Sequence, residues 1–316
     1  MESLLQIGIT FRDICLPIIL LIGIGWVMDR KFKLHLDSLI KLNIHLLVPA
    51  FVFVRITESS IDPRTGIRIV GFTFCILGIT FLLSQAVSML RKESRQGRAA
   101  LQLSTMFYNA GNFGIPVTAL AYPEVGPMIH VYVFMTLNVS SFSLGILLAH
   151  SQNDDEKEKR TLLSLLLQSP LYAVCLAWIF KGFEAPVDQW VFFWKPLNYL
   201  ADSLIGIALI TLGVQLSKTR PPKIEGTLAW ALGIRLIGGP VIAMILVRAF
   251  GYTGDFAAVL ILGTAAPTAV ITALLAHEFK ADSRFASATV FYSTLLSAIT
   301  VTGILFILKN GWIPWI

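Results

Sequence analysis

The sequence predicts an all-α membrane protein with ten transmembrane helices. Hydrophobic residues make up 55% of the 316 residues and charged residues only 14%, whereas a soluble domain carries about 25% charged residues. The mean hydropathy is +0.74. The apolar residues fall into runs of about 20, the length at which a helix crosses the hydrocarbon core of a bilayer. These runs occupy residues 8–28, 37–57, 66–90, 99–121, 127–150, 161–181, 196–217, 225–250, 255–278 and 285–308.

The first five runs make up residues 1–150, which we interpret as one structural repeat. No basic segment or small-residue cleavage site precedes the run at 8–28, so we expect a retained helix and not a signal peptide. The runs up to residue 150 are joined by short segments that leave no room for a soluble domain. The strongly polar tract at 151–160 then divides the chain near its midpoint and predicts a linker.

The last five runs, in residues 161–316, predict a second repeat. Because each half has an odd number of spans, the second must cross the membrane in the opposite sense, which is the geometry of an inverted repeat. Two pairs of prolines agree with this: Pro17 and Pro170 are 153 residues apart, and Pro116 and Pro267 are 151 apart.

The Lys and Arg residues predict the orientation, because cytoplasmic loops are enriched in them. The segments after odd-numbered runs hold Arg30, Lys31, Lys33, Arg91, Lys92, Arg95, Arg98, Lys157, Lys159, Arg160, Lys218, Arg220, Lys223, Lys280 and Arg284. The opposite side holds only Arg64, Lys181, Lys195, Arg248 and Lys309. This asymmetry places both termini outside in a multi-pass protein of the cell (inner) membrane. It also accounts for the basic pI of 9.3 without nucleic-acid binding, since no basic face is formed.

The fourth and ninth runs each carry a proline among glycines or small polar residues, Pro116 and Pro267. Proline removes a backbone donor and clashes with the preceding turn, so we expect both helices to break and to cross at mid-membrane. Since proline favours the first turn of a helix, each should open a half-helix whose electropositive N-terminus faces the membrane centre. Paired interruptions in corresponding positions of two halves indicate a transporter's binding site.

Converging helix N-termini attract anions, so the predicted ligand is a small organic anion. Polar side chains beside the two breaks can add directional hydrogen bonds; they belong to Asn109, Asn112, Thr264 and Thr268. The competing interpretation is a pair of ordinary proline kinks that neighbouring helices satisfy.

Taken together, the motifs of the chain resemble the auxin efflux carrier family over nearly the whole length. They are Ile22–Trp26, Leu42–Pro49, Asn109–Pro116, Leu200–Asp202, Thr211–Gly213, Arg235–Pro240, Ala266–Pro267 and His277–Phe279. Bacterial members of that family are named as permeases for malate, malonate and related acids. The resemblance implies a fold like that of the bile acid/sodium symporters, with a scaffold domain of helices 1, 2, 6 and 7. Helices 3–5 and 8–10 would form a transport domain that moves in an elevator-like mechanism.

The resemblance also implies substrate contacts, residue by residue. Asn112 and the backbone around Pro116 and Pro267 would contact the substrate carboxylate, and Asn138 would line the site. Asn43 and Val48 would face it from the scaffold, and two copies would form a homodimer through the scaffold. The polar tract at 151–160 is short compared with the long loop of the plant carriers, which favours an acid smaller than auxin.

We therefore expect a secondary transporter of small mono- or dicarboxylates. A receptor built on a transporter fold and an intramembrane enzyme are the alternatives. The sequence has no GxxxxGK[ST], HExxH or GxSxG motif, and it indicates no metal or cofactor and no enzyme. Coupling to sodium or to protons is left open.

Two charged residues are singled out. Arg235 lies inside the eighth run, where an unpaired charge is costly, so it must have partners. It is either a countercharge for the substrate or a donor to backbone carbonyls freed by a helix break, and the second interpretation is favoured. For Asp202 the two interpretations are the N-cap of the seventh helix and a proton relay, and the N-cap is favoured.

Overall fold

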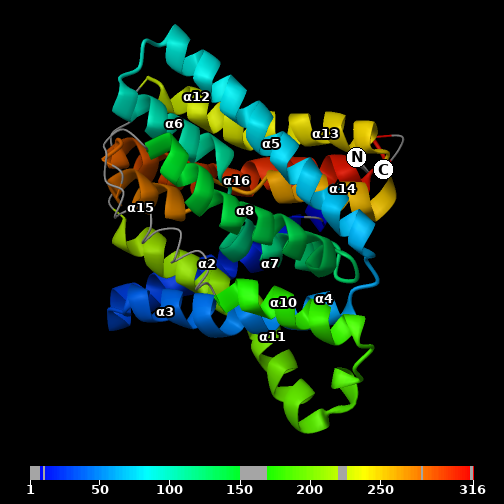
Figure 1. Ribbon diagram of the computed structural model, residues 1–316. Coiled ribbons are helices and arrows are strands. Elements are labelled where there is room, and N and C mark those ends of the chain that lie inside the picture. The colour runs from blue at the N-terminus through cyan, green and yellow to red at the C-terminus, as the bar shows by residue number, and fades with distance from the viewer. Residues whose placement is uncertain (1–7, 10, 150–168, 220–225, 279, 314–315) are drawn as a thin grey trace.

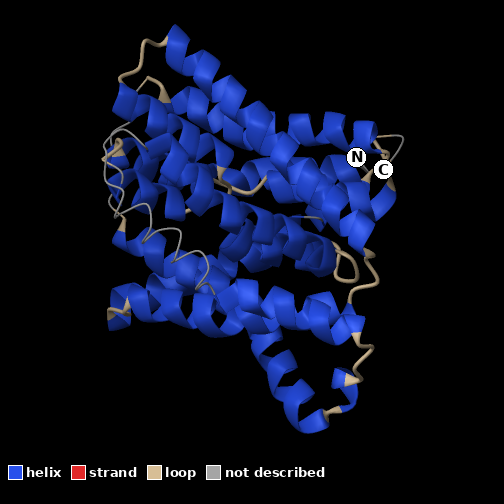
Figure 2. Ribbon diagram, in the orientation of Figure 1, coloured by secondary structure: helices blue, strands red, loops and turns tan. Residues whose placement is uncertain are grey.

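The computed structural model describes residues 8–9, 11–149, 169–219, 226–278, 280–313 and 316. The predicted linker at 151–160 and the first residues of the sixth run, 161–168, lie outside them. Within the described part, every regular element is helical and no strand is present (Figure 2).

The elements of the first half follow the predicted runs. They are η1 (Phe11–Cys15), α2 (Leu16–Phe32), α3 (Leu36–Leu42), η2 (Asn43–Leu47), α4 (Val48–Glu58), α5 (Pro63–Leu90), α6 (Arg95–Met106), η3 (Ala110–Gly114), α7 (Ile115–Ala121) and α8 (Gly126–Ala149). Those of the second half are α10 (Ser169–Gly182), η4 (Val187–Gln189), α11 (Val191–Lys218), α12 (Leu228–Gly233), η5 (Ile234–Gly238), α13 (Gly239–Phe250), α14 (Gly254–Thr264), α15 (Ile271–Glu278) and α16 (Ser283–Lys309).

Among the described residues, six helices are long and apolar enough to cross a membrane. They are Phe11–Phe32, Leu36–Glu58, Pro63–Leu90, Val191–Lys218, Leu228–Phe250 and Ser283–Lys309. The surface of these helices is apolar, with Ile67, Leu82 and Ile299 each more than half exposed, whereas Thr73 and Thr80 of α5 are fully buried. This distribution, apolar outside and small polar inside, suits a chain whose solvent is lipid.

Four of the prolines are each preceded by a π turn that accommodates the ring. Four π turns, η1, η2, η3 and η5, each end two residues before a proline: Pro17, Pro49, Pro116 and Pro240. A proline ring pushes away the carbonyl four residues earlier and offers no N–H to it. In η2, η3 and η5 the next N–H instead bonds the carbonyl five residues back, as in Ile115 to Ala110. The wider turn keeps the helix continuous.

The helices pack as two sets. In one, α2 packs on α11, and α4 packs against both α10 and α11. In the other, α5, α6, α7, α8 and the elements from α12 to α16 contact one another. Figure 1 shows α4, α10 and α11 along the lower edge and α5, α12 and α13 along the upper edge.

Backbone contact between α2 and α11 depends on two glycines. A Cβ at Gly25 would overlap the Ile210 carbonyl, and a Cβ at Gly213 would overlap the Ile22 carbonyl. The absence of both side chains lets the two backbones touch, as small residues do at helix interfaces in membranes. The same pair is tied at its far end, where Lys218 Nζ lies 2.8 Å from Asp29 Oδ1 and the Ser217 hydroxyl also donates to Asp29.

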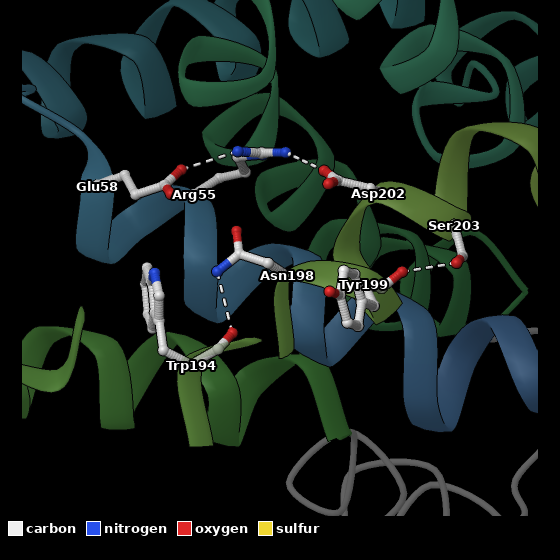
Figure 3. A network of polar contacts seen from close by, with 7 residues as sticks. All are labelled: Arg55, Glu58, Trp194, Asn198, Tyr199, Asp202 and Ser203. Carbon is white, nitrogen blue, oxygen red and sulfur yellow. Dashed lines mark hydrogen bonds and ion pairs between the residues drawn. The ribbon is translucent and has the colours of Figure 1, made fainter. Parts of the chain in front are cut away.

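Asp202 is not a helix N-cap, and that prediction is wrong. Helix α11 begins at Val191 and tolerates Pro196 inside, so Asp202 lies well within the helix. Its Oδ1 instead accepts from Arg55 Nη2 at 2.7 Å, while Arg55 Nη1 donates to Glu58 at 2.8 Å (Figure 3). Arg55 therefore connects α4 to α11. In the same view Asn198 and Ser203 bond carbonyls of their own helix.

Candidate functional site

Both predicted interruptions are present, and the two interrupted segments lie against each other. Helix α6 ends at Met106 before η3 begins at Ala110, and α14 ends at Thr264 before α15 begins at Ile271. Between these ends the chain is not helical, and Tyr108 pairs with Thr268 in an antiparallel bridge. The Asn109 N–H donates to the Pro267 carbonyl at 2.7 Å, and the Ala269 N–H donates to the Phe107 carbonyl at 2.9 Å. Each break thus satisfies the backbone groups of the other.

The positions of the breaks differ from those predicted from proline. Pro116 does not open a half-helix: η3 already begins at Ala110, and its π turn leads into α7 without interruption. Pro267 lies inside the non-helical segment, and α15 begins four residues later at Ile271. The start of the first half-helix is set by a capping side chain, since Asn109 Oδ1 accepts from the Asn112 N–H at 3.1 Å.

Arg235 bonds the electronegative C-terminal ends of α6 and α14. Its guanidinium donates from Nη1 to the Thr105 carbonyl at 2.9 Å and from Nη2 to the Thr264 carbonyl at 2.6 Å. The side chain is fully buried, and its Cζ lies 4.7 Å from the centre of the Tyr108 ring. A cation at the C-termini of α6 and α14 is stabilised by both helix dipoles. The favoured interpretation, a donor to carbonyls freed by helix breaks, is confirmed.

Thr268 and Ser293 fasten the second break. The Thr268 hydroxyl donates to the Ser104 carbonyl at 2.8 Å, and its N–H donates to Ser293 Oγ at 3.0 Å. The Thr264 hydroxyl donates within its own helix, to Ile261 at 2.7 Å. The hydroxyl protons of both predicted threonines are therefore engaged with protein carbonyls, and these side chains remain available to a ligand only as acceptors.

Three of the predicted asparagines retain a buried polar atom without a hydrogen-bond partner in the described structure. These atoms are Asn43 Oδ1, Asn109 Nδ2 and Asn138 Oδ1. Buried amides are normally bonded, so each such atom calls for a partner that the protein does not supply. Asn43 is otherwise fixed, since its Nδ2 donates to Thr211 Oγ1 at 3.0 Å. The Asn112 side chain is partly exposed.

The elements that carry these asparagines contact one another. Helix α11 packs against both η2, which carries Asn43, and η3, which follows Asn109 and contains Asn112. Helix α8, which carries Asn138, also packs against η3. Val48 is buried at the start of α4, directly after η2, and Pro116 and Pro267 are buried as well.

Sequence reasoning missed one residue of this region. His130 of α8 is fully buried, and its Nε2 lies 3.1 Å from the Ala110 carbonyl at the start of η3. Its ring also fills the space beside Gly114 and Gly263, where a Cβ would overlap it. A lone histidine in an apolar run gives no periodicity or motif from which this contact could be predicted.

A separate cavity of about 320 Å³ lies between the two sets of helices, and none of the predicted site residues lines it. Its walls are Ile56, Pro63, Gly66, Ile67, Val70, Val131, Tyr132, Met135, Thr136, Val174 and Trp178. This lining is largely apolar and offers no cation, so it suits a carboxylate poorly. Within the described residues, no group of three or more His, Cys, Asp or Glu side chains is placed to hold a metal ion.

Comparison with known proteins relates most of this chain to carriers. Residues 13–305 match a family model described as "Membrane transport protein". A protein of Rhizobium meliloti (strain 1021), provisionally named a malonate transporter, is 22% identical over 95% of this chain and 96% of its own length. An uncharacterized transporter from Methanothermobacter thermautotrophicus is 25% identical over 90% and 94%. The Arabidopsis thaliana auxin efflux carrier component 7 is 25% identical over 42% of this chain and 22% of its own length.

Proposed function

The chain belongs to the family of membrane transport proteins that includes the auxin efflux carriers, and from this premise we propose that it is a secondary carrier of small organic anions. It is a multi-pass membrane protein, as the family and the apolar helices require. The substrate class that we favour is a small mono- or dicarboxylate such as malonate or malate. The name of the Rhizobium relative supports this choice.

The observation that carries the proposal is the mutual pairing of the two broken spans. Non-helical backbone inside a membrane protein is tolerated where it is buried in protein or lines a cavity, and it recurs at the binding sites of transporters. Here the two non-helical segments bond each other through Asn109 and Pro267, and Arg235 occupies the electronegative helix ends. The opposite ends, at Ala110 and Ile271, are left with their electropositive character for a carboxylate.

The architecture that we propose has ten spans in two inverted repeats of five, with α6–η3–α7 and α14–α15 as the crossing spans. The helix contacts support a scaffold domain of α2, α4, α10 and α11 and a transport domain of the remaining spans. The cavity between the two sets supports their relative motion, because that contact is incompletely packed. We propose elevator-like alternating access, with both termini outside the cell (inner) membrane.

We propose that the homodimer predicted for the scaffold uses the outward face of α2. Leu20, Ile24 and Val27 are exposed there at helical spacing.

The test is flux through the purified protein in proteoliposomes, with a panel of labelled mono- and dicarboxylates and imposed sodium, proton and voltage gradients. We expect uptake and counterflow of at least one small carboxylate. Saturable binding without any flux would favour the alternative of a receptor. Turnover of the acid into another product would favour an intramembrane enzyme.

The site is tested by Asn112→Ala. We expect loss of transport from a folded protein, because the side chain is partly exposed at the electropositive start of η3. Asn310→Ala is the matched control, since Asn310 is also partly exposed but bonds only the Phe306 carbonyl of its own helix, at 2.8 Å. Normal flux in Asn112→Ala would contradict the assignment of the site.

A further inference from the structure

His130 is a titratable group wedged between the two broken spans. Its ring lies against Gly114, in the first turns after one break, and against Gly263, in the last turn before the other. A Cβ at Gly263 would come within 2.7 Å of His130 Cε1. The imidazole therefore contacts both spans whose crossing forms the proposed site, and its side chain is 0% exposed.

The geometry fixes which nitrogen carries the proton. A carbonyl oxygen can only accept, so Nε2, 3.1 Å from the Ala110 carbonyl, must be the N–H of the neutral ring. The lone pair of Nδ1 is then buried without a hydrogen-bond partner among the described residues. A buried polar atom left unpaired costs free energy, so this nitrogen calls for a partner that the described residues do not supply.

Among the residues that the structure describes, no carboxylate is hydrogen-bonded to this nitrogen. Neither η3 nor α7, which hold the Ala110 carbonyl and Gly114, contains a titratable side chain, and α8 itself adds only Tyr132. The titratable groups on the other elements packed against α8 lie mainly towards the ends of their helices. They are Arg55 and Glu58 of α4, Arg64, Arg68 and Cys75 of α5, Arg95 and Arg98 of α6, Asp255 of α14, and His277 and Glu278 of α15.

A buried cation, the guanidinium of Arg235, bonds the carbonyl of Thr264, and Thr264 directly follows Gly263, which the His130 ring contacts. Its charge opposes a second positive charge on the ring while the site is empty. A bound carboxylate would reverse this balance. Protonation of the ring and binding of the anion should therefore favour each other, and such coupling is reciprocal.

We propose that Nδ1 of His130 binds a proton that is carried together with the anion, which makes the protein a proton-coupled carrier. This inference rests on the proposed function. A proton from the aqueous phase adds to the Nδ1 lone pair, the Nε2–H bond to Ala110 is kept, and the same proton leaves Nδ1 when the anion is released. A buried imidazolium without an anion leaves a positive charge uncompensated, so the proton is not carried readily across the membrane unless the anion is bound.

The experiment compares wild type and His130→Gln in proteoliposomes with and without a pH gradient, acidic on the side of uptake, and with a labelled dicarboxylate as the probe. The glutamine amide can donate to the Ala110 carbonyl in place of Nε2 but cannot titrate. In wild type we expect the gradient to raise the initial rate and to drive accumulation above the external concentration. In His130→Gln we expect the ratio of rates with and without the gradient to fall to one, whatever rate remains.

The control is His277→Gln, because His277 is exposed near the end of α15 and should keep the wild-type response. If His130→Gln carries no flux, proton uptake by the wild-type protein in weakly buffered detergent solution is measured instead. Addition of the dicarboxylate should then raise the pH of the solution, and the rise should correspond to about one proton taken up per anion bound. This proton uptake should be absent from His130→Gln.

The two proposals fail in different ways. Counterflow in wild type with no response to the pH gradient, or with no proton uptake on binding, would overturn proton coupling and leave the carrier intact. A gradient response that persists in His130→Gln would overturn the role of this residue. Absence of binding and flux for every acid tested would overturn the proposed function and the coupling with it.

Discussion

Arg235 allows a quantitative test of what stabilises the contact between the two interrupted segments, because it donates hydrogen bonds to the last turns of α6 and α14. In Arg235→Met a shorter, unbranched apolar side chain replaces the guanidinium and both donors are lost, so the carbonyls of Thr105 and Thr264 are left buried and unpaired. Each unsatisfied buried acceptor costs about 1–3 kcal/mol. The expected loss in the free energy of unfolding is therefore about 2–6 kcal/mol. Arg235→Lys keeps one cationic donor and should lose about half of that.

The assay is thermal unfolding of the purified protein in detergent, followed by intrinsic fluorescence. For a chain of this size about 1 kcal/mol corresponds to roughly 2 °C, so Arg235→Met should unfold about 4–12 °C below wild type, with Arg235→Lys between them. Arg68→Met is the matched control. Arg68 also donates to a carbonyl, that of Phe250, but on the exposed surface of the protein, where such contacts contribute little.

The reasoning would be refuted if Arg235→Met unfolded within about 2 °C of wild type. That result would mean that the two carbonyls find other donors or water at little cost. It would also mean that the two bonds of Arg235 contribute little to holding the two interrupted segments together.

Two further predictions concern the contacts between α11 and its neighbours. Gly213→Ala should destabilise the protein by more than about 2 kcal/mol, because the new Cβ would meet the backbone of α2 and not a movable side chain. Gly206→Ala on the same helix has free space and should be neutral or stabilising by up to about 1 kcal/mol. Thermal unfolding of both variants checks this order, and equal effects would contradict it. Asp202→Asn should lower the free energy of unfolding by less than about 1 kcal/mol, because the Asp202 side chain is 66% exposed where it meets Arg55. A double-mutant cycle with Arg55→Gln measures the coupling energy of the pair, which should vanish at high salt. A coupling energy above about 1 kcal/mol that does not change with salt would contradict this prediction.

The interruptions at the fourth and ninth spans were predictable because their cause is local. Glycine and proline weaken a helix wherever they stand, and two breaks at matching places in the two halves indicated a crossing. The residues at which each helix stops were not predictable. A π turn absorbs Pro116, and the true start at Ala110 depends on the Asn109 cap and on the Pro267 carbonyl of the partner segment.

For Arg235, too, the sequence predicted part of the answer and the packed structure decided the rest. Its position inside an apolar run required a partner for the charge, and a broken helix was the favoured source of one. Which carbonyls it bonds follows from the packing of η5 against α6 and from the position of Thr264, and no sequence spacing encodes that contact. The residue at which a helix begins was less predictable still. Asp202 was expected to cap the start of its helix, but α11 begins at Val191, ahead of Pro196.

The sequence by itself determined that this chain is a helical membrane transport protein, where its apolar runs lie and which two of these runs are interrupted. Those properties depend on composition, run length and local backbone preference, which act within about 20 residues. The tertiary structure alone decided that the two breaks pair with each other, that one buried cation joins their electronegative ends and that His130 lies between them. Several of these contacts join residues more than a hundred positions apart, as Arg235 and Thr105 are, and only the packed fold brings their atoms together.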